Sequence, residues 1–333
     1  MEAPVLLYIL RRLASAISVI IVTLVASFGL FYLAPTDPAG VICGTRCTPA
    51  RYEEIYKSLH LDQPVWQQML DYFQGLVVGR TYTSGGITIN CSAPCLGYSY
   101  GQGQPVTTLL ANALPVTISI VFGSAIAYLL IGVAAGTFAA RRRGTALDRV
   151  MVGGTLTIGS IPYFVVALVA SLYIPLYLGF IPDTGWTPLT DNPLKWFSGL
   201  LLPWIILGIV NSASYTRYSR ASMIESLSED YVRTARSKGI SERRVIYRHG
   251  LRAAMTPIAT IFGLDVAFAL TGALFTESIF GLPGLGLVTL RAFQKYDLPV
   301  LMGGVLVGVV VLVVMNLLVD LLYTVLDPRV RLA

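Results

Sequence analysis

Long apolar runs, separated by two polar segments, set the pattern of this chain. A membrane-spanning helix needs about 20 mainly apolar residues to cross roughly 30 Å of hydrocarbon. The runs are continuous rather than alternating, which indicates helices and excludes a closed barrel. We therefore expect six spans, at approximately Leu13–Leu33, Leu114–Phe138, Val150–Phe180, Gly199–Tyr215, Pro257–Phe280 and Val300–Leu326.

Two of these runs carry features that refine the prediction. The third holds Pro162 and Pro175, which predict a kink or an early exit from the bilayer. The first is longer than the roughly 7–15 residues of a secretory signal core, and no small-residue cleavage site follows it. We therefore expect the first run to be a retained membrane anchor.

The composition supports a polytopic membrane protein. Apolar types make up 55% of the 333 residues and charged types only 13%, and the mean hydropathy is +0.68. A soluble chain of this size lacks the interior to bury so much apolar surface. An ordinary cytosolic enzyme, a disordered chain and a small disulfide scaffold are excluded on this ground.

The positions of the basic residues predict the orientation in the membrane. Two precede the first span, four lie between spans two and three, nine between spans four and five, and two follow span six, which is 17 of the 24 Lys and Arg. We expect the chain to lie in the plasma (inner) membrane. Cytoplasmic loops carry the excess of Lys and Arg, so we expect both termini in the cytoplasm. The net charge of +6 is then explained by basic residues on the cytoplasmic face, and nucleic acid is not an expected partner.

The spans and loops divide the chain into three segments. Residues 1–33 form the N-terminal segment with the first span, 34–112 a large extracytoplasmic loop, and 113–333 a core with five further spans. The loop carries all four cysteines, Cys43, Cys47, Cys91 and Cys95. An oxidising compartment favours two disulfides, with a four-thiolate zinc site and free thiols as alternatives. Of the three possible pairings we favour a link between the two Cys-bearing segments over two tight rings, because it would pin about 45 intervening residues.

Motifs of enzyme chemistry are absent from the sequence. There is no phosphate-binding Gly-x4-Gly-Lys-Ser/Thr loop, no His-Glu-x2-His and no Gly-x-Ser-x-Gly elbow, and the chain has only two histidines. We therefore expect no catalytic residue and no metal site.

Polar residues inside the predicted spans are few: Asp265, Asn316 and Asp320, with Glu277 near an outer end. A charge in the middle of a span is costly, so it normally faces protein or water. We expect Asp265 and Asp320 inside the helix bundle, with Asn316 on the same helical face as Asp320. A structural hydrogen bond or ion pair is the favoured interpretation, and proton coupling of a carrier is the alternative.

The cytoplasmic segment after the fourth span predicts two helices joined by a glycine. Ser226 and Glu229 have capping-box spacing, so a first helix is expected from about Leu227 to Lys238. Gly239 is placed to end it in a left-handed conformation. Ser241 can cap a second helix that runs toward the membrane.

This segment resembles the coupling motif Glu-Ala-Ala-x3-Gly of ABC importer permeases. Arg233 and Thr234 replace the first two motif residues, while Ala235 and Gly239 match it, and His249–Arg252 replaces the later Ile-x-Leu-Pro. Further stretches resemble the dipeptide/oligopeptide branch of this binding-protein-dependent family: Leu61–Pro64, Gly97–Val106, Thr276–Gly286 and Asp320–Arg331.

The resemblance implies a six-helix permease bundle with a cytoplasmic coupling helix, at about 226–240, and a large extracytoplasmic loop. Its expected partners are a second permease, two ABC ATPase subunits that bind ATP and Mg, and an extracytoplasmic peptide-binding protein. The chain itself would hold no cofactor. The residues expected to couple to the ATPase are Glu229, Asp230, Tyr231, Val232, Arg233, Thr234, Ala235, Arg236, Ser237, Lys238 and Gly239.

Three other classes of function were weighed against this one. An ion-coupled carrier predicts more intramembrane carboxylates and inverted repeats than the sequence contains. A membrane-embedded hydrolase lacks its catalytic constellation, and a structural scaffold remains the third alternative. The cargo is open between dipeptide, oligopeptide, modified peptide, nickel complex and heme.

Overall fold

The computed structural model describes residues 3–33, 37–44, 47–58, 61–84, 87–99, 101–178 and 184–326. The chain divides into two compact units. The first unit comprises Met1–Val116 and Pro283–Val313, and the second comprises Thr117–Leu282 and Val314–Ala333.

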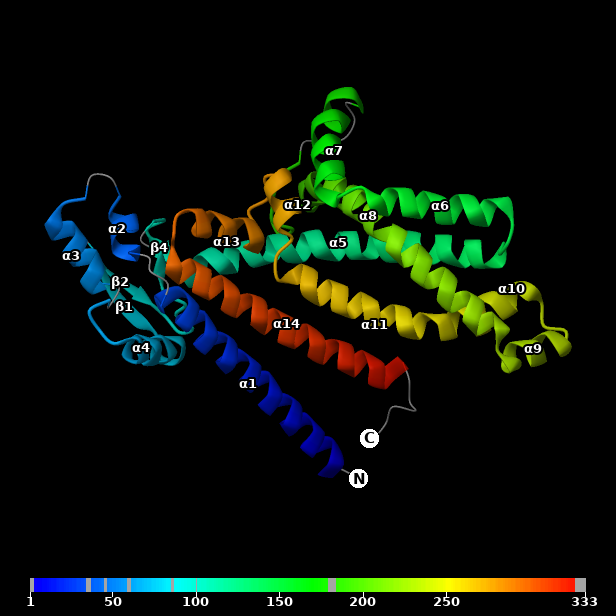
Figure 1. Cartoon of the computed structure of the whole chain (residues 1–333), viewed down its shortest axis with the longest axis horizontal. Coiled ribbons are helices and arrows are strands. Elements are labelled where there is room, and N and C mark those ends of the chain that lie inside the picture. The colour runs from blue at the N-terminus through cyan, green and yellow to red at the C-terminus, as the bar shows by residue number, and fades with distance from the viewer. Residues whose placement is uncertain are drawn as a thin grey trace. The chain divides into compact units, whose positions relative to one another are not determined.

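Helices make up most of the described chain (Figure 1). They are α1 (Ala3–Leu33), α2 (Pro38–Cys43), α3 (Pro49–Ser58), α4 (Val65–Val78), α5 (Val106–Arg141), α6 (Ala146–Ser160), α7 (Tyr163–Leu178), α8 (Pro193–Ser228), α9 (Asp230–Ser237), α10 (Glu242–Arg244), the π-helical turn η1 (Val245–Gly250), α11 (Leu251–Leu270), α12 (Leu274–Ile279), α13 (Leu285–Gln294) and α14 (Leu298–Leu326).

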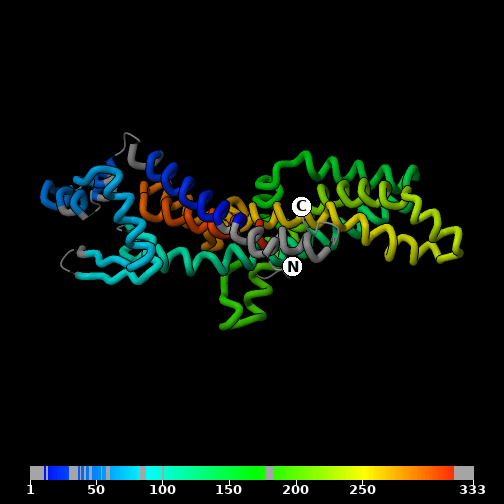
Figure 2. The backbone as a smooth tube through the Cα atoms, turned by 90° about the horizontal axis from the view of Figure 1, so that it is seen from below, coloured from blue at the N-terminus to red at the C-terminus, as the bar shows by residue number. Residues whose placement is uncertain are grey.

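The first unit also contains strands, so the expectation of an all-α chain needs a correction. Strands β1 (Arg80–Ser84) and β2 (Ile87–Cys91) form an antiparallel hairpin that pairs Arg80 with Cys91, visible in cyan in Figure 2. Strands β3 (Tyr98–Ser99) and β4 (Gln104–Pro105) form a second, shorter pair. Both pairs lie in the polar segment, whose Thr, Tyr and Ile residues favour strands.

The polar segment of the first unit folds against apolar helices. Its core joins Leu24 and Phe28 of α1 to Tyr72 of α4 and to Leu301 and Met302 of α14, all nearly fully buried. The ring of Phe28 meets that of Tyr72 edge-on at 5.4 Å.

A polar contact reinforces this packing at the start of α14. The hydroxyl of Ser99 donates a hydrogen bond to Oδ2 of Asp297, a residue 198 positions away, and accepts one from the backbone N–H of Gln102 at 3.1 Å. Ser99 is fully buried and Asp297 nearly so. Oδ1 of Asp297 has no hydrogen-bond partner among the described residues.

The four cysteines form two disulfides, and the favoured link between the two segments is wrong. Cys43 bonds Cys47, and Cys91 bonds Cys95, with Cα atoms 5.1 and 5.5 Å apart. Local turns make these short pairings possible: α2 ends at Cys43 and is followed by Gly44 with φ 73°, and β2 ends at Cys91. Both Cα separations lie in the range that a disulfide spans without backbone movement.

Among the residues that the structure describes, four helices are long and apolar enough to cross a membrane, and a bent pair raises the number to five. The four lie at Val106–Arg141, Pro193–Ser228, Glu242–Leu270 and Leu298–Leu318. Helix α1 adds an apolar stretch over Ala14–Gly29.

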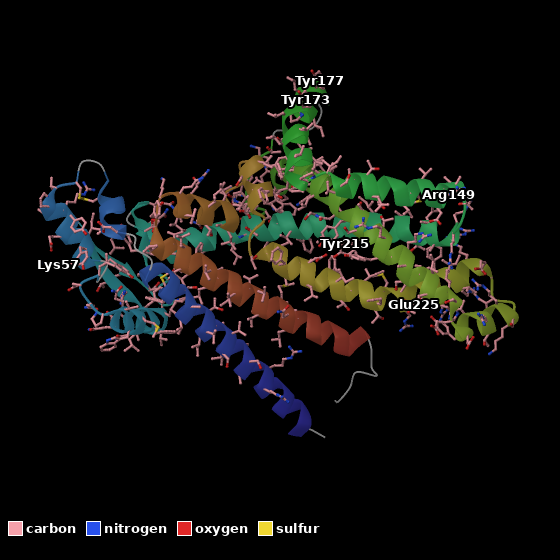
Figure 3. All side chains as sticks on the ribbon, viewed as in Figure 1. Lys57, Arg149, Tyr173, Tyr177, Tyr215 and Glu225 are labelled. Atoms are coloured by element: carbon pink, nitrogen blue, oxygen red, sulfur yellow. A yellow bond between two sulfur atoms is a disulfide. The ribbon has the colours of Figure 1, made fainter. Side chains whose placement is uncertain are left out.

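Two of the expected spans differ in shape from the prediction. The third is broken between α6 and α7, which meet at 88° where Pro162 interrupts the helix, as the sequence indicated. The fifth ends at Leu270 rather than near Phe280, because Gly272 adopts φ 143° and α12 starts separately. Tyr173 and Tyr177 of α7 are exposed and stack at 5.9 Å (Figure 3).

Small residues bring α5 and α8 close together in the second unit. A Cβ atom added at Gly136 would lie 2.6 Å from Cβ of Ser219 and 2.6 Å from the carbonyl oxygen of Thr216, so only glycine fits there. Helix packing through small residues is common in membrane bundles. Helix α8 also packs along α6 and α11, and these helices run beside one another in Figure 1.

Candidate functional site

The short helix α9 stands between two breaks in the backbone. Helix α8 runs past Ser226 and ends at Ser228, Glu229 is extended (φ −65°, ψ 149°), and α9 then covers Asp230–Ser237. The predicted capping box is therefore wrong, because Ser226 is still inside α8 and no side chain caps α9. Gly239 adopts φ 74°, the left-handed conformation expected for it.

One face of α9 is buried against its own chain. Val232 and Ala235 pack on Val245 of η1, with Leu227 and Ile240 alongside. Val232 is completely buried. Ala235, one of the residues expected to couple to the ATPase, is thus covered by Val245 of the same chain.

An ion pair ties α9 to the helix that follows. Nε and Nη2 of Arg236 donate to the two carboxylate oxygens of Glu242 at 3.1 and 2.8 Å. Nη1 of Arg236 also reaches the carbonyl oxygen of Leu227 at 3.5 Å. The hydrogen bond to Glu242 raises the pKa of Arg236 above its ordinary value. Arg236 therefore ties the C-terminal end of α9 to α10 and to the last turn of α8.

The outer face of α9 is exposed and mixes charge with one aromatic ring. Tyr231 is 45% exposed, and its hydroxyl lies 3.5 Å from the carbonyl oxygen of His249. The exposed residues are Glu229, Asp230, Tyr231, Arg233, Thr234, Arg236, Ser237, Lys238 and Gly239. A rigid helix with such a face can bind another protein, since a half-buried aromatic commonly anchors an interface.

The polar residues of the spans lie in three different places. Asp265 of α11 accepts a hydrogen bond of 2.7 Å from Tyr215 of α8. Its side chain is nevertheless exposed in this single chain, which differs from the expected burial. Glu277 of α12 is fully buried, and its Oε1 accepts a hydrogen bond of 2.7 Å from Thr117. Asn316 is half-buried, whereas the side chain of Asp320 lies outside the described residues.

Sequence reasoning missed a buried ion pair between α6 and α8. Nε and Nη2 of Arg220 donate to the carboxylate of Asp148 at 2.6 and 2.8 Å. The side chain of Asp148 is 5% exposed. The sequence signal for this pair is Asp148, a single acidic residue in a stretch that is otherwise rich in arginine.

Among the described residues, no three His, Cys, Asp or Glu side chains lie close enough together to bind a metal ion.

Comparison with known proteins identifies the family. Residues 132–332 match the model of the binding-protein-dependent transport system inner membrane component, and residues 5–121 match the N-terminal model of such membrane components. The chain belongs to this family. It is thus a membrane permease component of a transport system, and not itself the catalytic subunit.

Two relatives cover nearly the whole chain. The dipeptide transport system permease protein DppB of Escherichia coli (strain K12) is 35% identical over 348 residues, which covers 97% of this chain and 98% of that protein. The protein named "Probable peptide ABC transporter permease protein y4tP" of Sinorhizobium fredii (strain NBRC 101917 / NGR234) is 34% identical over 324 residues, with 97% and 99% covered. The several apolar helices agree with a multi-pass location in the inner membrane.

Proposed function

We propose that this chain is one of two permease subunits of an ATP-driven importer of di- and oligopeptides. The near full-length similarity to peptide permeases is the observation that supports this cargo. A second, homologous permease completes the pathway across the bilayer. An extracytoplasmic binding protein delivers the peptide, and two ATPase subunits bind ATP and Mg.

The proposed topology has six spans, with both termini in the cytoplasm. Helix α1, the four long apolar helices and the bent pair α6–α7 account for the six. The segment 34–112 is then the extracytoplasmic loop, and α9 lies on the cytoplasmic side, where the basic residues concentrate.

In this proposal the exposed face of α9 docks on an ATPase subunit. Support comes from the way the helix is fixed: Val232 anchors one face, and Arg236 holds Glu242 at the far end. A helix held in this way moves with α8 and α10 instead of bending away from them. Closure of the ATPase dimer on ATP would shift α9 and so bias the bundle between inward and outward states.

The test introduces a charge into the exposed face without touching the buried one. Thr234→Glu should reduce both co-purification of the ATPase subunits and ATP-dependent uptake of a labelled dipeptide into proteoliposomes that hold the complete importer and its binding protein. The matched control is Thr190→Glu, since Thr190 is also exposed but lies on the opposite side of the proposed topology. Normal assembly and uptake with Thr234→Glu would show that α9 is not the docking helix.

A further inference from the structure

An unpaired row of basic side chains follows α9 at the start of the next long helix. Arg243, Arg244, Arg248 and Arg252 are all exposed. We call these four residues and Tyr247, which is 55% exposed, the arginine face.

Burial of the opposite side fixes the direction of this face. Val245 and Ile246 are almost completely buried, and Gly250 is buried too. Val245 packs on α9, and Ile246 packs on Met223 of α8. The helix cannot rotate its arginines inward without exposing these apolar side chains.

The charges of the arginine face are not neutralised within the part of the chain that the structure describes. None of its four arginines forms an ion pair there. Glu242, the neighbouring acidic residue, is engaged by Arg236. Arg244, Arg248 and Arg252 recur at every fourth residue of a helical segment whose opposite side is buried, so their like charges gather on one exposed side. Such an arrangement favours a bound anion.

A hollow in the surface lies within this face. It has a volume of about 460 Å³. Its lining consists of Ser241, Arg243, Arg244, Tyr247 and Arg248. The hydroxyl of Ser241 caps no backbone group, so it can donate to a ligand.

The position along the helix places this hollow at a membrane surface. The apolar helix Glu242–Leu270 has 29 residues, which is about 43 Å at 1.5 Å per residue. The hydrocarbon of a bilayer is only about 30 Å thick, so about nine residues extend beyond it. With Leu270 at the far side, those residues are 242–250, which include four of the five residues that line the hollow.

We propose that the hollow binds the phosphate headgroup of an anionic phospholipid. Guanidinium groups bind phosphate oxygens in a bidentate manner, and Arg244 and Arg248 both line the hollow. A tyrosine beside them suits the boundary between headgroups and acyl chains. Basic pockets next to membrane helices are known lipid sites in general, and the neighbouring apolar helix provides the surface for the acyl chains.

The test counts bound lipid on the full-length protein. The complete importer is purified, mixed with phosphatidylglycerol and phosphatidylethanolamine, and examined by native mass spectrometry. Arg244→Gln/Arg248→Gln should bind phosphatidylglycerol roughly 30-fold more weakly than wild type. Arg142→Gln/Arg143→Gln is the matched control, since it removes the same charge from exposed residues outside the hollow and should retain near wild-type binding.

Three outcomes would overturn the proposal. The first is equal phosphatidylglycerol binding in the Arg244/Arg248 variant and wild type. The second is displacement of the lipid by inorganic phosphate at comparable concentration, which would indicate a site for a soluble anion. The third is loss of the ATPase subunits with unchanged lipid binding, which would assign the arginine face to a protein. The lipid count needs neither ATP nor peptide, so a failure of peptide uptake leaves it readable.

Discussion

Asp297 is a carboxylate placed where water cannot reach it. Burial raises its pKa above the ordinary aspartate value, although the hydrogen bonds from Ser99 and from the backbone of Val300 and the charge of Lys295 act in the opposite direction. One of its oxygens has no partner among the described residues. An uncompensated buried acceptor is costly when it is charged and less so when it is protonated.

The stability of the wild-type chain should therefore depend on pH through this residue. A raised native pKa contributes stability that is complete below the ordinary aspartate pKa of about 4 and is lost as the pH rises through the native value. Asp297→Asn cannot ionise and keeps an oxygen for Ser99. The melting temperature of the variant minus that of wild type should increase between pH 4 and pH 7.5 in detergent. A difference that does not change with pH would contradict this assignment.

The two disulfides should differ in their contribution to stability although they close rings of equal size. Each joins cysteines four positions apart, so the loop-entropy contribution is about 2 kcal/mol for both. Cys91 and Cys95 are buried, whereas Cys43 is only half-buried. Cys91→Ala/Cys95→Ala should thus lower the melting temperature more than Cys43→Ala/Cys47→Ala. The opposite ranking of melting temperatures would show that burial does not determine how much each disulfide stabilises the protein.

At the scale of the helix, long apolar runs predicted where spans occur but not where they end. Helices α5 and α8 continue past the apolar stretches, and the end of α8 packs on η1 of the same chain. The capping box failed for this reason: α8 runs through Ser226. The buried side of α9 could not be predicted, because Val245 lies beyond the Gly239 turn. The hairpin had a local signal, Gly85-Gly86 between two strand-prone runs, which was overlooked.

Gly239 offers a clean test of backbone conformation in α9. A Cβ at Gly239 or at Gly153 of α6 would meet no atom within 4 Å, so neither substitution causes a clash. Of these two glycines, only Gly239 has a positive φ. Gly239→Ala should destabilise the end of α9 by about 1 kcal/mol, while Gly153→Ala should be neutral or stabilising. Hydrogen exchange at Asp230–Ser237 should quicken in the first variant alone, and equal protection in both would refute the role of the left-handed turn.

At the scale of the whole molecule, composition was sufficient to predict a membrane protein, and the resemblance of the segment around Gly239 to a coupling motif indicated its family. They could not predict that the compact units are discontinuous, since Pro283–Val313 joins the N-terminal unit. That grouping depends on contacts such as Ser99 with Asp297, and no local pattern reports them.

The proposed orientation can be checked by labelling, because all four native cysteines are in disulfides. A membrane-impermeant maleimide should label Lys57→Cys in intact cells. Lys238→Cys should react only after permeabilisation, since it lies on the opposite side in the proposed topology. Both lysines are exposed, so a difference in labelling would report the side of the membrane on which each residue lies. Labelling of Lys238→Cys in intact cells would reverse the assigned orientation.

The contact of Ser99 with Asp297 also sets an order of events during synthesis. The two residues are 198 positions apart. A ribosome needs roughly 10–40 s to synthesise that length at about 5–20 residues per second. For that time the segment around Ser99 has emerged while its core partners Leu301 and Met302 do not yet exist. A chain that stops before α14 never completes this core. The loop of such a chain lacks the apolar partners that α14 supplies.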